Sequence, residues 1–105
     1  MVEDIRHRVK PLYESGDLLG FVFMSSDGES FHNESFLCDS AARDSMEPFV
    51  TTYRKLARAN RYIKQLVTEL DDVILVHSRR DDGHVLYSVD IEADIDQIAA
   101  MLKEG

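Results

Sequence analysis

The chain has a single cysteine, Cys38, among its 105 residues. One thiol excludes an intrachain disulfide, and so little cysteine is typical of proteins that work inside the cell. No apolar run approaches the roughly 20 residues of a membrane-spanning helix. The first residues, Met1 to Asp4, lack the basic start and apolar core of a signal peptide. We therefore expect a cytoplasmic protein without membrane insertion.

Motifs for catalysis and for cofactors are also missing. The five glycines do not form a phosphate-binding loop, and neither a paired-carboxylate motif nor a zinc-protease helix motif is present. Cys38 with a histidine could form a nucleophile pair, but a lone cysteine near a loop is more often incidental. We expect no catalytic residue, no cofactor and no metal, and we predict that the protein is not an enzyme.

Basic residues are scarce in comparison with acidic ones. Twelve Lys and Arg residues face 20 Asp and Glu residues, which gives a net charge of −8. This balance argues against general nucleic-acid binding and against adsorption to anionic membranes, because both need a basic surface. A hydrophobic content of 44% and a charged content of 30% are values of a globular protein. The length fits one domain, residues 1–105.

The stretch from Met46 to Leu70 has the apolar spacing of one long amphipathic helix. Apolar residues recur at steps of three and four, with one missed turn at Asn60. Asp44 is the candidate N-cap, and Glu47 is its capping-box partner. Pro48 would then lie in the first turn, where a missing N–H is harmless. The predicted buried stripe consists of Met46, Phe49, Val50, Tyr53, Leu56, Ala57, Ile63, Leu66, Val67 and Leu70.

The opposite face of this predicted helix is basic. Arg54, Arg58 and Arg61 are spaced four and three residues apart and would form one stripe. Five basic and two acidic residues give the Met46–Leu70 stretch a charge of +3, whereas the remainder of the chain carries −11. The stripe is either an ordinary solvated face or a docking surface for an acidic partner or a second copy of the chain.

The rest of the chain predicts two hairpins and two further helices. The first hairpin turns at Asp27-Gly28 and the second at Asp82-Gly83. The strand after the first turn is polar, so we expect it at a sheet edge. In the second hairpin Val85, Tyr87 and Val89 should share one face. The predicted elements are a helix over residues 2–12, strands over 18–24, 29–36, 73–79 and 84–90, and a helix over 92–104.

These elements predict an α+β domain. We expect an antiparallel sheet of about four strands, formed by the two hairpins and packed on the long central helix, with helices at the N- and C-terminal ends. Pro11 either kinks the first helix or breaks it into two pieces.

His77 and His84 are the candidate ligand-binding pair. They could face each other across the second hairpin, close to Asp81 and Asp82. The group looks superficially like a metal site, but its spacing matches no strong ligand motif. A polar hairpin end is the more common explanation.

The order of elements resembles the roadblock/LC7 group within the profilin-like α+β architecture. The resemblance is carried by the apolar strand and Asp-Gly turn from Leu18 to Gly28, by the long helix from Met46 to Leu70, and by the ending of strand, turn, strand and helix. Roadblock domains usually have three strands after the long helix, and only two fit here before Glu92.

The resemblance implies a non-catalytic homodimer that serves as a scaffold for small GTPases or motor complexes. Dimerisation would use the long helix and an edge of the sheet, and the equivalent surface here includes Arg54, Arg58 and Arg61. An alternative is a likeness to small acidic secretion chaperones, which hold an unfolded effector segment. A third possibility is a small-ligand or metal-binding enzyme that uses His77 and His84.

Overall fold

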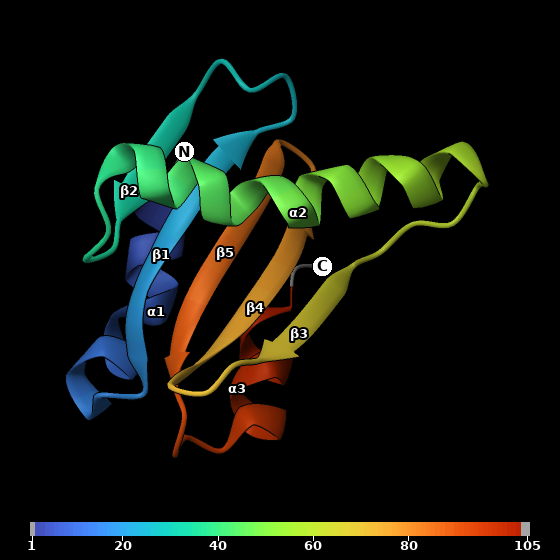
Figure 1. The fold of residues 1–105 in the computed structure, drawn as a ribbon. Coiled ribbons are helices and arrows are strands. Elements are labelled where there is room, and N and C mark those ends of the chain that lie inside the picture. Colours follow the sequence, from blue (N-terminus) through green and yellow to red (C-terminus); the bar gives the residue numbers. More distant parts are fainter. Residues whose placement is uncertain (1, 104–105) are drawn as a thin grey trace.

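Figure 1 shows the computed structural model, which describes residues 2–103. The described chain folds into an α+β domain with extents of 38 × 27 × 25 Å. Its elements are α1 (Glu3–Ser15), β1 (Leu18–Ser25), β2 (Phe31–Glu34), α2 (Asp39–Arg58), β3 (Gln65–Glu69), β4 (Val73–Arg80), β5 (Gly83–Asp90) and α3 (Ile95–Leu102).

The five strands form one antiparallel sheet in the order β2-β1-β5-β4-β3. The two predicted hairpins are β1–β2 and β4–β5, and β2 lies at an edge as its polar sequence predicted. The close packing of β5 on β1 requires a glycine at Gly83. A Cβ atom there would lie 2.2 Å from the Met24 carbonyl oxygen, much closer than two such atoms can approach.

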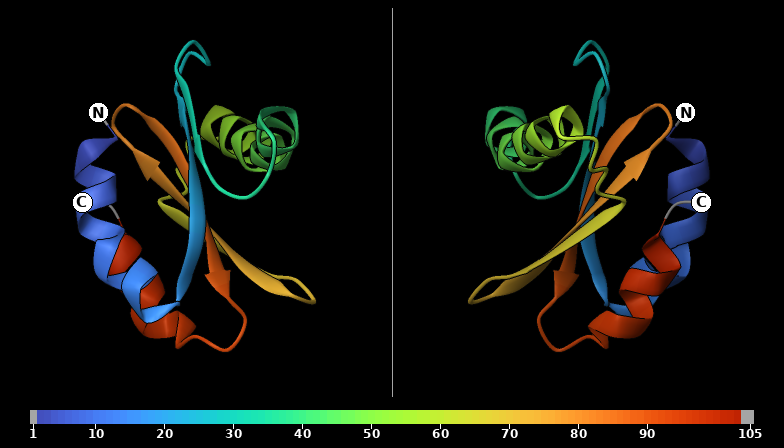
Figure 2. Two further views of the ribbon diagram at one scale, coloured as in Figure 1. Left: turned by 90° about the vertical axis from the view of Figure 1, so that its left-hand side faces the viewer. Right: turned by 90° about the vertical axis from the view of Figure 1, so that its right-hand side faces the viewer.

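Helices cover both faces of the sheet. Figure 2 shows α1 and α3 on one face and α2 on the other. On the α1 and α3 face, Val85, Tyr87 and Val89 of β5 are fully buried, which confirms the predicted alternation. They pack with Phe21 of β1 and with the helices, and this side holds the larger core. Burial of these side chains provides much of the free energy of folding.

The smaller core lies under the first twelve residues of α2. Ala42, Met46, Phe49 and Val50 are buried and pack against β1 and β5. The first hydrogen bond of the helix runs from the Ala42 N–H to the Cys38 carbonyl oxygen, at 2.9 Å. The predicted cap at Asp44 is therefore wrong, since this residue lies inside the helix.

α2 also ends much earlier than the apolar spacing predicted. Asn60 has a φ of 59°, in the left-handed region. The Asn60 N–H donates to the Ala57 carbonyl oxygen and the Arg61 N–H donates to the Leu56 carbonyl oxygen. This is a Schellman motif, which closes a helix with its last carbonyl groups satisfied. The predicted helix from Met46 to Leu70 is therefore corrected to Asp39–Arg58, with Pro48 in its interior.

The remaining part of that predicted helix contains an additional strand. β3 pairs with β4 over five residues, from Gln65↔Ser78 to Glu69↔Ile74. The sheet consequently has five strands rather than about four. Three of them follow α2, so the departure from the roadblock arrangement noted in the sequence is removed.

The terminal helices agree with the sequence more closely. α1 is continuous from Glu3 to Ser15 with Pro11 inside it, so the proline does not break the helix. α3 starts later than predicted, because Asp94 caps it and accepts a hydrogen bond from the Gln97 N–H. Residue 104, where we predicted its end, lies outside the described residues. Within residues 2–103, none of the helices has the length and apolar character to cross a membrane.

Candidate functional site

The second half of α2 extends past the region where the helix is buried. The buried residues of α2 end at Val50, and Leu56 is 38% exposed. Leu56 is therefore not part of the buried stripe that the sequence predicted. Figure 1 shows this end of the helix projecting beyond the sheet before the chain returns to β3. The projecting end leaves helix surface free to interact.

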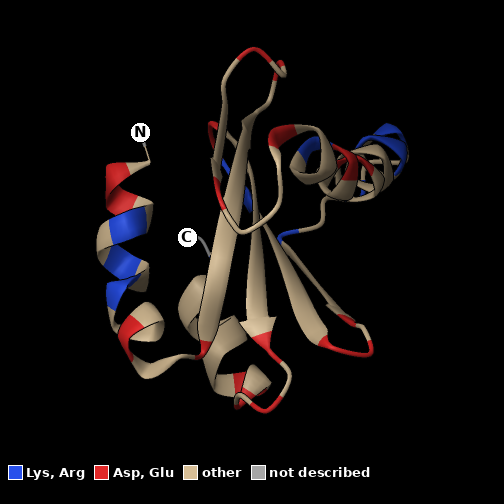
Figure 3. Cartoon of the chain, turned by 60° about the vertical axis from the view of Figure 1, so that its left-hand side comes forward, with Lys and Arg blue, Asp and Glu red and all other residues tan. Residues whose placement is uncertain are grey.

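The three arginines predicted to form a stripe are all exposed at this end. Arg54 and Arg58 lie one turn apart on α2, whereas Arg61 lies in the loop that follows the helix. No ion pair involves any of the three within residues 2–103. Figure 3 shows basic residues gathered at this end of α2, while acidic residues occupy most of the turns.

β3 forms the second outer edge of the sheet. The Arg79 N–H donates to the Lys64 carbonyl oxygen, and the Leu70 N–H donates to the Val73 carbonyl oxygen. Bonding to β4 alternates along an antiparallel strand, so the N–H of Val67 points away from the sheet. Val67 and Leu70 are 45% and 44% exposed. The edge thus offers unpaired backbone groups together with exposed apolar side chains.

His77 and His84 do face each other, as the sequence predicted. Their rings stack with centroids 5.2 Å apart, and His77 Nε2 lies 3.0 Å from His84 Nδ1. Phe49 stacks on His77, and Tyr53 packs edge-on against His84. Both histidines are almost fully buried beneath α2. They form a polar pair inside an aromatic cluster.

Burial determines the ionisation of this pair. Desolvation, followed by the charge of Arg79, lowers the pKa of His77 to about 4. Desolvation, followed by the charges of His77, Arg79 and Arg54, lowers the pKa of His84 to about 4. Both rings are therefore neutral at pH 7. Within residues 2–103 no group of three or more His, Cys, Asp or Glu side chains is placed to hold a metal ion.

A cavity of about 670 Å³ opens beside the aromatic cluster. It lies between the end of α2, the loop leading to β3 and the β4–β5 turn. Tyr53 and Tyr62 contribute aromatic rings to its lining, and Lys64 and Arg79 contribute positive charges. The Arg79 guanidinium lies 5.1 Å from the centre of the Tyr53 ring and donates to the Gly83 carbonyl oxygen. Ile63, Arg80, Asp81 and Asp82 complete the lining.

The sequence reasoning missed this cavity. The apolar spacing predicts Tyr53 in the core and continues the helix through Lys64, whereas the helix ends six residues before Lys64. A signal was present at Asn60, which readily adopts the left-handed conformation that ends a helix. With a helix end there, Lys64 lies next to a strand and can pair with β4.

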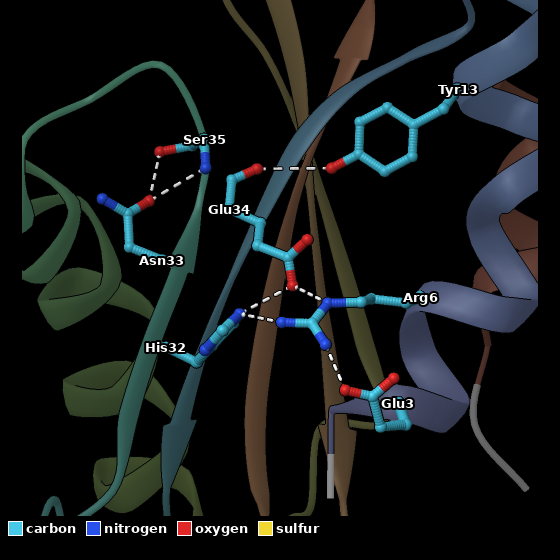
Figure 4. A network of polar contacts seen from close by, with 7 residues as sticks. All are labelled: Glu3, Arg6, Tyr13, His32, Asn33, Glu34 and Ser35. Carbon is cyan, nitrogen blue, oxygen red and sulfur yellow. Dashed lines mark hydrogen bonds and ion pairs between the residues drawn. The ribbon is translucent and has the colours of Figure 1, made fainter.

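A second polar cluster joins α1 to β2 on the other side of the molecule (Figure 4). Arg6 forms ion pairs with Glu3 and Glu34, and His32 Nε2 lies 2.6 Å from Glu34 Oε2. The Tyr13 hydroxyl donates to the Glu34 carbonyl oxygen. The Glu34 carboxylate raises the pKa of Arg6. These groups pair with one another, so we interpret the cluster as a structural connection between α1 and the edge strand β2.

Comparison with known proteins identifies the fold. A Roadblock/LC7 domain from Streptomyces avermitilis superimposes with a TM-score of 0.60 and 22% identity, over 82% of this chain and 77% of that one. MglC from Myxococcus xanthus superimposes with a TM-score of 0.51 and 13% identity, over 93% of this chain and 89% of that one. The protein therefore has a roadblock/LC7-like fold.

Sequence comparison adds little to this result. No family model matches the chain. A cysteine–tRNA ligase from Roseobacter denitrificans is 39% identical over 59 residues, which is 52% of this chain. The aligned region spans only 12% of the length of that ligase. A match of this extent shows neither a family nor an activity.

Proposed function

We propose that the protein is a non-catalytic interaction module of the cytoplasm, which forms a homodimer and docks a protein partner. A small GTPase is the partner class that the roadblock-like fold favours. The observation that carries the proposal is the surface formed by the projecting end of α2 and the edge of β3. Three large apolar side chains are exposed along it, namely Leu56, Val67 and Leu70.

The free edge of β3 favours a two-fold dimer. A second β3 can add to this edge because its outward N–H and C=O groups have no partner strand in the described chain. In a two-fold arrangement the two β3 strands run antiparallel, so the start of one lies beside the end of the other.

The charges at the two ends of β3 match this arrangement. Arg61 precedes the strand, whereas Glu69, Asp71 and Asp72 lie at its end and in the following turn. Antiparallel pairing brings the basic end of each copy next to the acidic end of the other, and both contacts are favourable. A parallel arrangement would place like charges together. Charge therefore favours the two-fold dimer.

The proposal is tested by the absolute mass in solution, measured by light scattering across protein and salt concentration. We expect twice the chain mass of 12.0 kDa, with weaker association at high salt because exposed charges are screened. Val67→Pro removes the outward N–H without removing a bond to β4, and we expect it to give monomers. Val67→Thr keeps the N–H and serves as the matched control.

A folded monomer of the unaltered chain at high concentration would contradict the homodimer. Dimers that persist in a folded Val67→Pro variant would contradict the β3 edge as the contact. Partner class is tested by co-elution with purified small GTPases. Stable capture of an unfolded effector segment instead of a folded GTPase would favour the secretion-chaperone alternative.

A further inference from the structure

We propose that the cavity between the end of α2 and the β4–β5 turn binds a small planar organic anion, with the size and chemistry of a nucleoside monophosphate. This inference goes beyond the interaction function proposed above, because it concerns a ligand held by one copy of the chain. The inference is carried by three features of the cavity, which are its positive charges, its aromatic rings and the acidic residues of the β4–β5 turn.

Two positive charges of the cavity, on Lys64 and Arg79, lie opposite each other and repel. The Arg79 N–H donates to the Lys64 carbonyl oxygen at 2.9 Å, so Lys64, just before β3, lies opposite Arg79 of β4 and continues the pairing of the two strands. Opposite residues of an antiparallel pair project to the same face, and like charges there are destabilising. An anion between Lys64 and Arg79 would turn this repulsion into attraction.

Neither cation is neutralised within residues 2–103, where no carboxylate forms an ion pair with Lys64 or Arg79. The neighbouring Arg80 differs, because it contacts Asp82 at 3.0 Å and Asp4 at 2.9 Å. Arg79 is half-buried and makes a hydrogen bond to the Gly83 carbonyl oxygen, at 2.9 Å. Its Nε atom is buried and has no hydrogen-bond partner among the described residues. Guanidinium groups in such positions bind phosphate and carboxylate groups strongly.

The aromatic rings supply a surface for a planar group. Tyr53 and Tyr62 lie with their centroids 6.5 Å apart and inclined at 55°. Tyr62 is 64% exposed, although a large aromatic side chain gains free energy when it is covered. Stacking of a nucleobase on such a ring contributes about 1–3 kcal/mol. The cavity volume of about 670 Å³ is within the usual range for small-molecule sites.

The acidic residues in the cavity lining select among planar anions. Asp81 and Asp82 line it, and Asp82 is already paired with Arg80. Asp81 is exposed and can accept hydrogen bonds from hydroxyl or amino groups. A ligand that fits all three features has an anionic end at Lys64 and Arg79, a ring at Tyr62 and hydrogen-bond donors toward Asp81. A nucleoside monophosphate has this combination.

The test uses the full chain with three probes, measured by calorimetry and by amide chemical shifts. Adenosine 5′-monophosphate carries both ring and phosphate, adenosine carries the ring alone, and inorganic phosphate carries the charge alone. We expect the monophosphate to bind at least about tenfold more tightly than either of the others, with shifts centred on Tyr62, Lys64 and Arg79. Equal binding of inorganic phosphate would overturn the proposed planar ligand, and absence of binding would overturn the site.

Two exposed positions allow variants that keep the fold. Lys64→Gln removes one charge, and Lys10→Gln on α1 is its matched control. Tyr62→Leu removes the ring, and Phe36→Leu, at a residue 74% exposed, is its control. We expect both cavity variants to weaken monophosphate binding by about tenfold or more and both controls to leave it unchanged. Unchanged binding in Lys64→Gln and Tyr62→Leu, or equal loss in the controls, would overturn the assignment.

Discussion

His77 and His84 are buried in a position that keeps both rings neutral. Their contact at 3.0 Å joins two ring nitrogens, so one must donate and the other accept, as two neutral imidazoles can do. A proton on the accepting ring would remove that hydrogen bond. Arg79 and Arg54 add positive charge nearby, and these groups also oppose protonation. The pair is therefore stable as a neutral unit.

The pair predicts a loss of stability in mild acid. In the unfolded chain a histidine titrates near pH 6.5, and in the folded chain both do so near pH 4. Between these values the unfolded state binds more protons, so the free energy of unfolding rises with pH. We expect the free energy of unfolding to have its full value above pH 6.5. It should fall as the pH drops toward 4, by about 3 kcal/mol for one such histidine.

Urea unfolding at a series of pH values measures this dependence. His77→Leu should make the profile between pH 6.5 and 4 less steep, because only His84 of the pair then remains, and His7→Gln, at an exposed position on α1, is the control. A wild-type stability that stays constant over this window would contradict the burial of the pair in neutral form.

Single residues explain why the alternation of β5 was predictable from the sequence and the end of α2 was not. The alternation of Val85, Tyr87 and Val89 was predictable, because every second residue of a strand faces the same core. The end of α2 depends on the φ angle of Asn60, which apolar spacing does not report. The apolar pattern of a helix continues past Asn60, because Leu66 and Leu70 of the next segment are four residues apart. This spacing places two residues on one face of a helix, and because it is even it also places them on one face of a strand.

At the level of the element, the two halves of α2 have different roles. The first half packs against the sheet through Met46 and Phe49, while the second half carries Leu56 and the exposed arginines. The helix is thus held at one end and free for interaction at the other. The division predicts that substitutions in the first half affect folding, and that those in the second half affect binding.

Two equivalent truncations test this division. Met46 is fully buried, so Met46→Ala should lower the free energy of unfolding by about 2–5 kcal/mol through the lost burial and the cavity left behind. Leu56 is 38% exposed, and Leu56→Ala should lower it by on the order of 1 kcal/mol, because less apolar surface is returned to water. Denaturant midpoints of the two variants provide the comparison. A larger loss for Leu56→Ala would contradict the projecting end of α2.

At the level of the whole molecule, the sequence predicted the α+β class, both hairpins and the terminal helices. The strand β3 was not predicted, because a short strand of five residues can follow a helical pattern without an obvious break. The cavity was beyond sequence reasoning for a different reason. Its lining comes from three separate segments, around residues 53, 62–64 and 79–82, which only the pairing of β3 with β4 brings together.

The basic surface at the end of α2 can be tested for its part in docking. Arg54→Glu together with Arg58→Glu reverses two charges at exposed positions, so stability should change by less than about 1 kcal/mol. We expect this variant to lose co-elution with a GTPase that binds the unaltered chain. Lys10→Glu together with Lys103→Glu changes the net charge equally on other parts of the surface and should retain binding. Retained binding in the arginine variant would exclude the two arginines from the docking surface.

Charge is also distributed unevenly over the molecule. The chain carries −8 overall, yet the end of α2 is locally positive. A negatively charged protein in solution would be attracted to this end, although the molecule as a whole is negative. Such a field turns two diffusing proteins toward each other before their surfaces meet, and it raises the frequency of productive collisions at low ionic strength. Arg54, Lys55 and Arg58 at the projecting helix end, with Arg61 and Lys64 in the segment that follows it, would therefore influence how quickly an acidic partner is found, in addition to how firmly it is held.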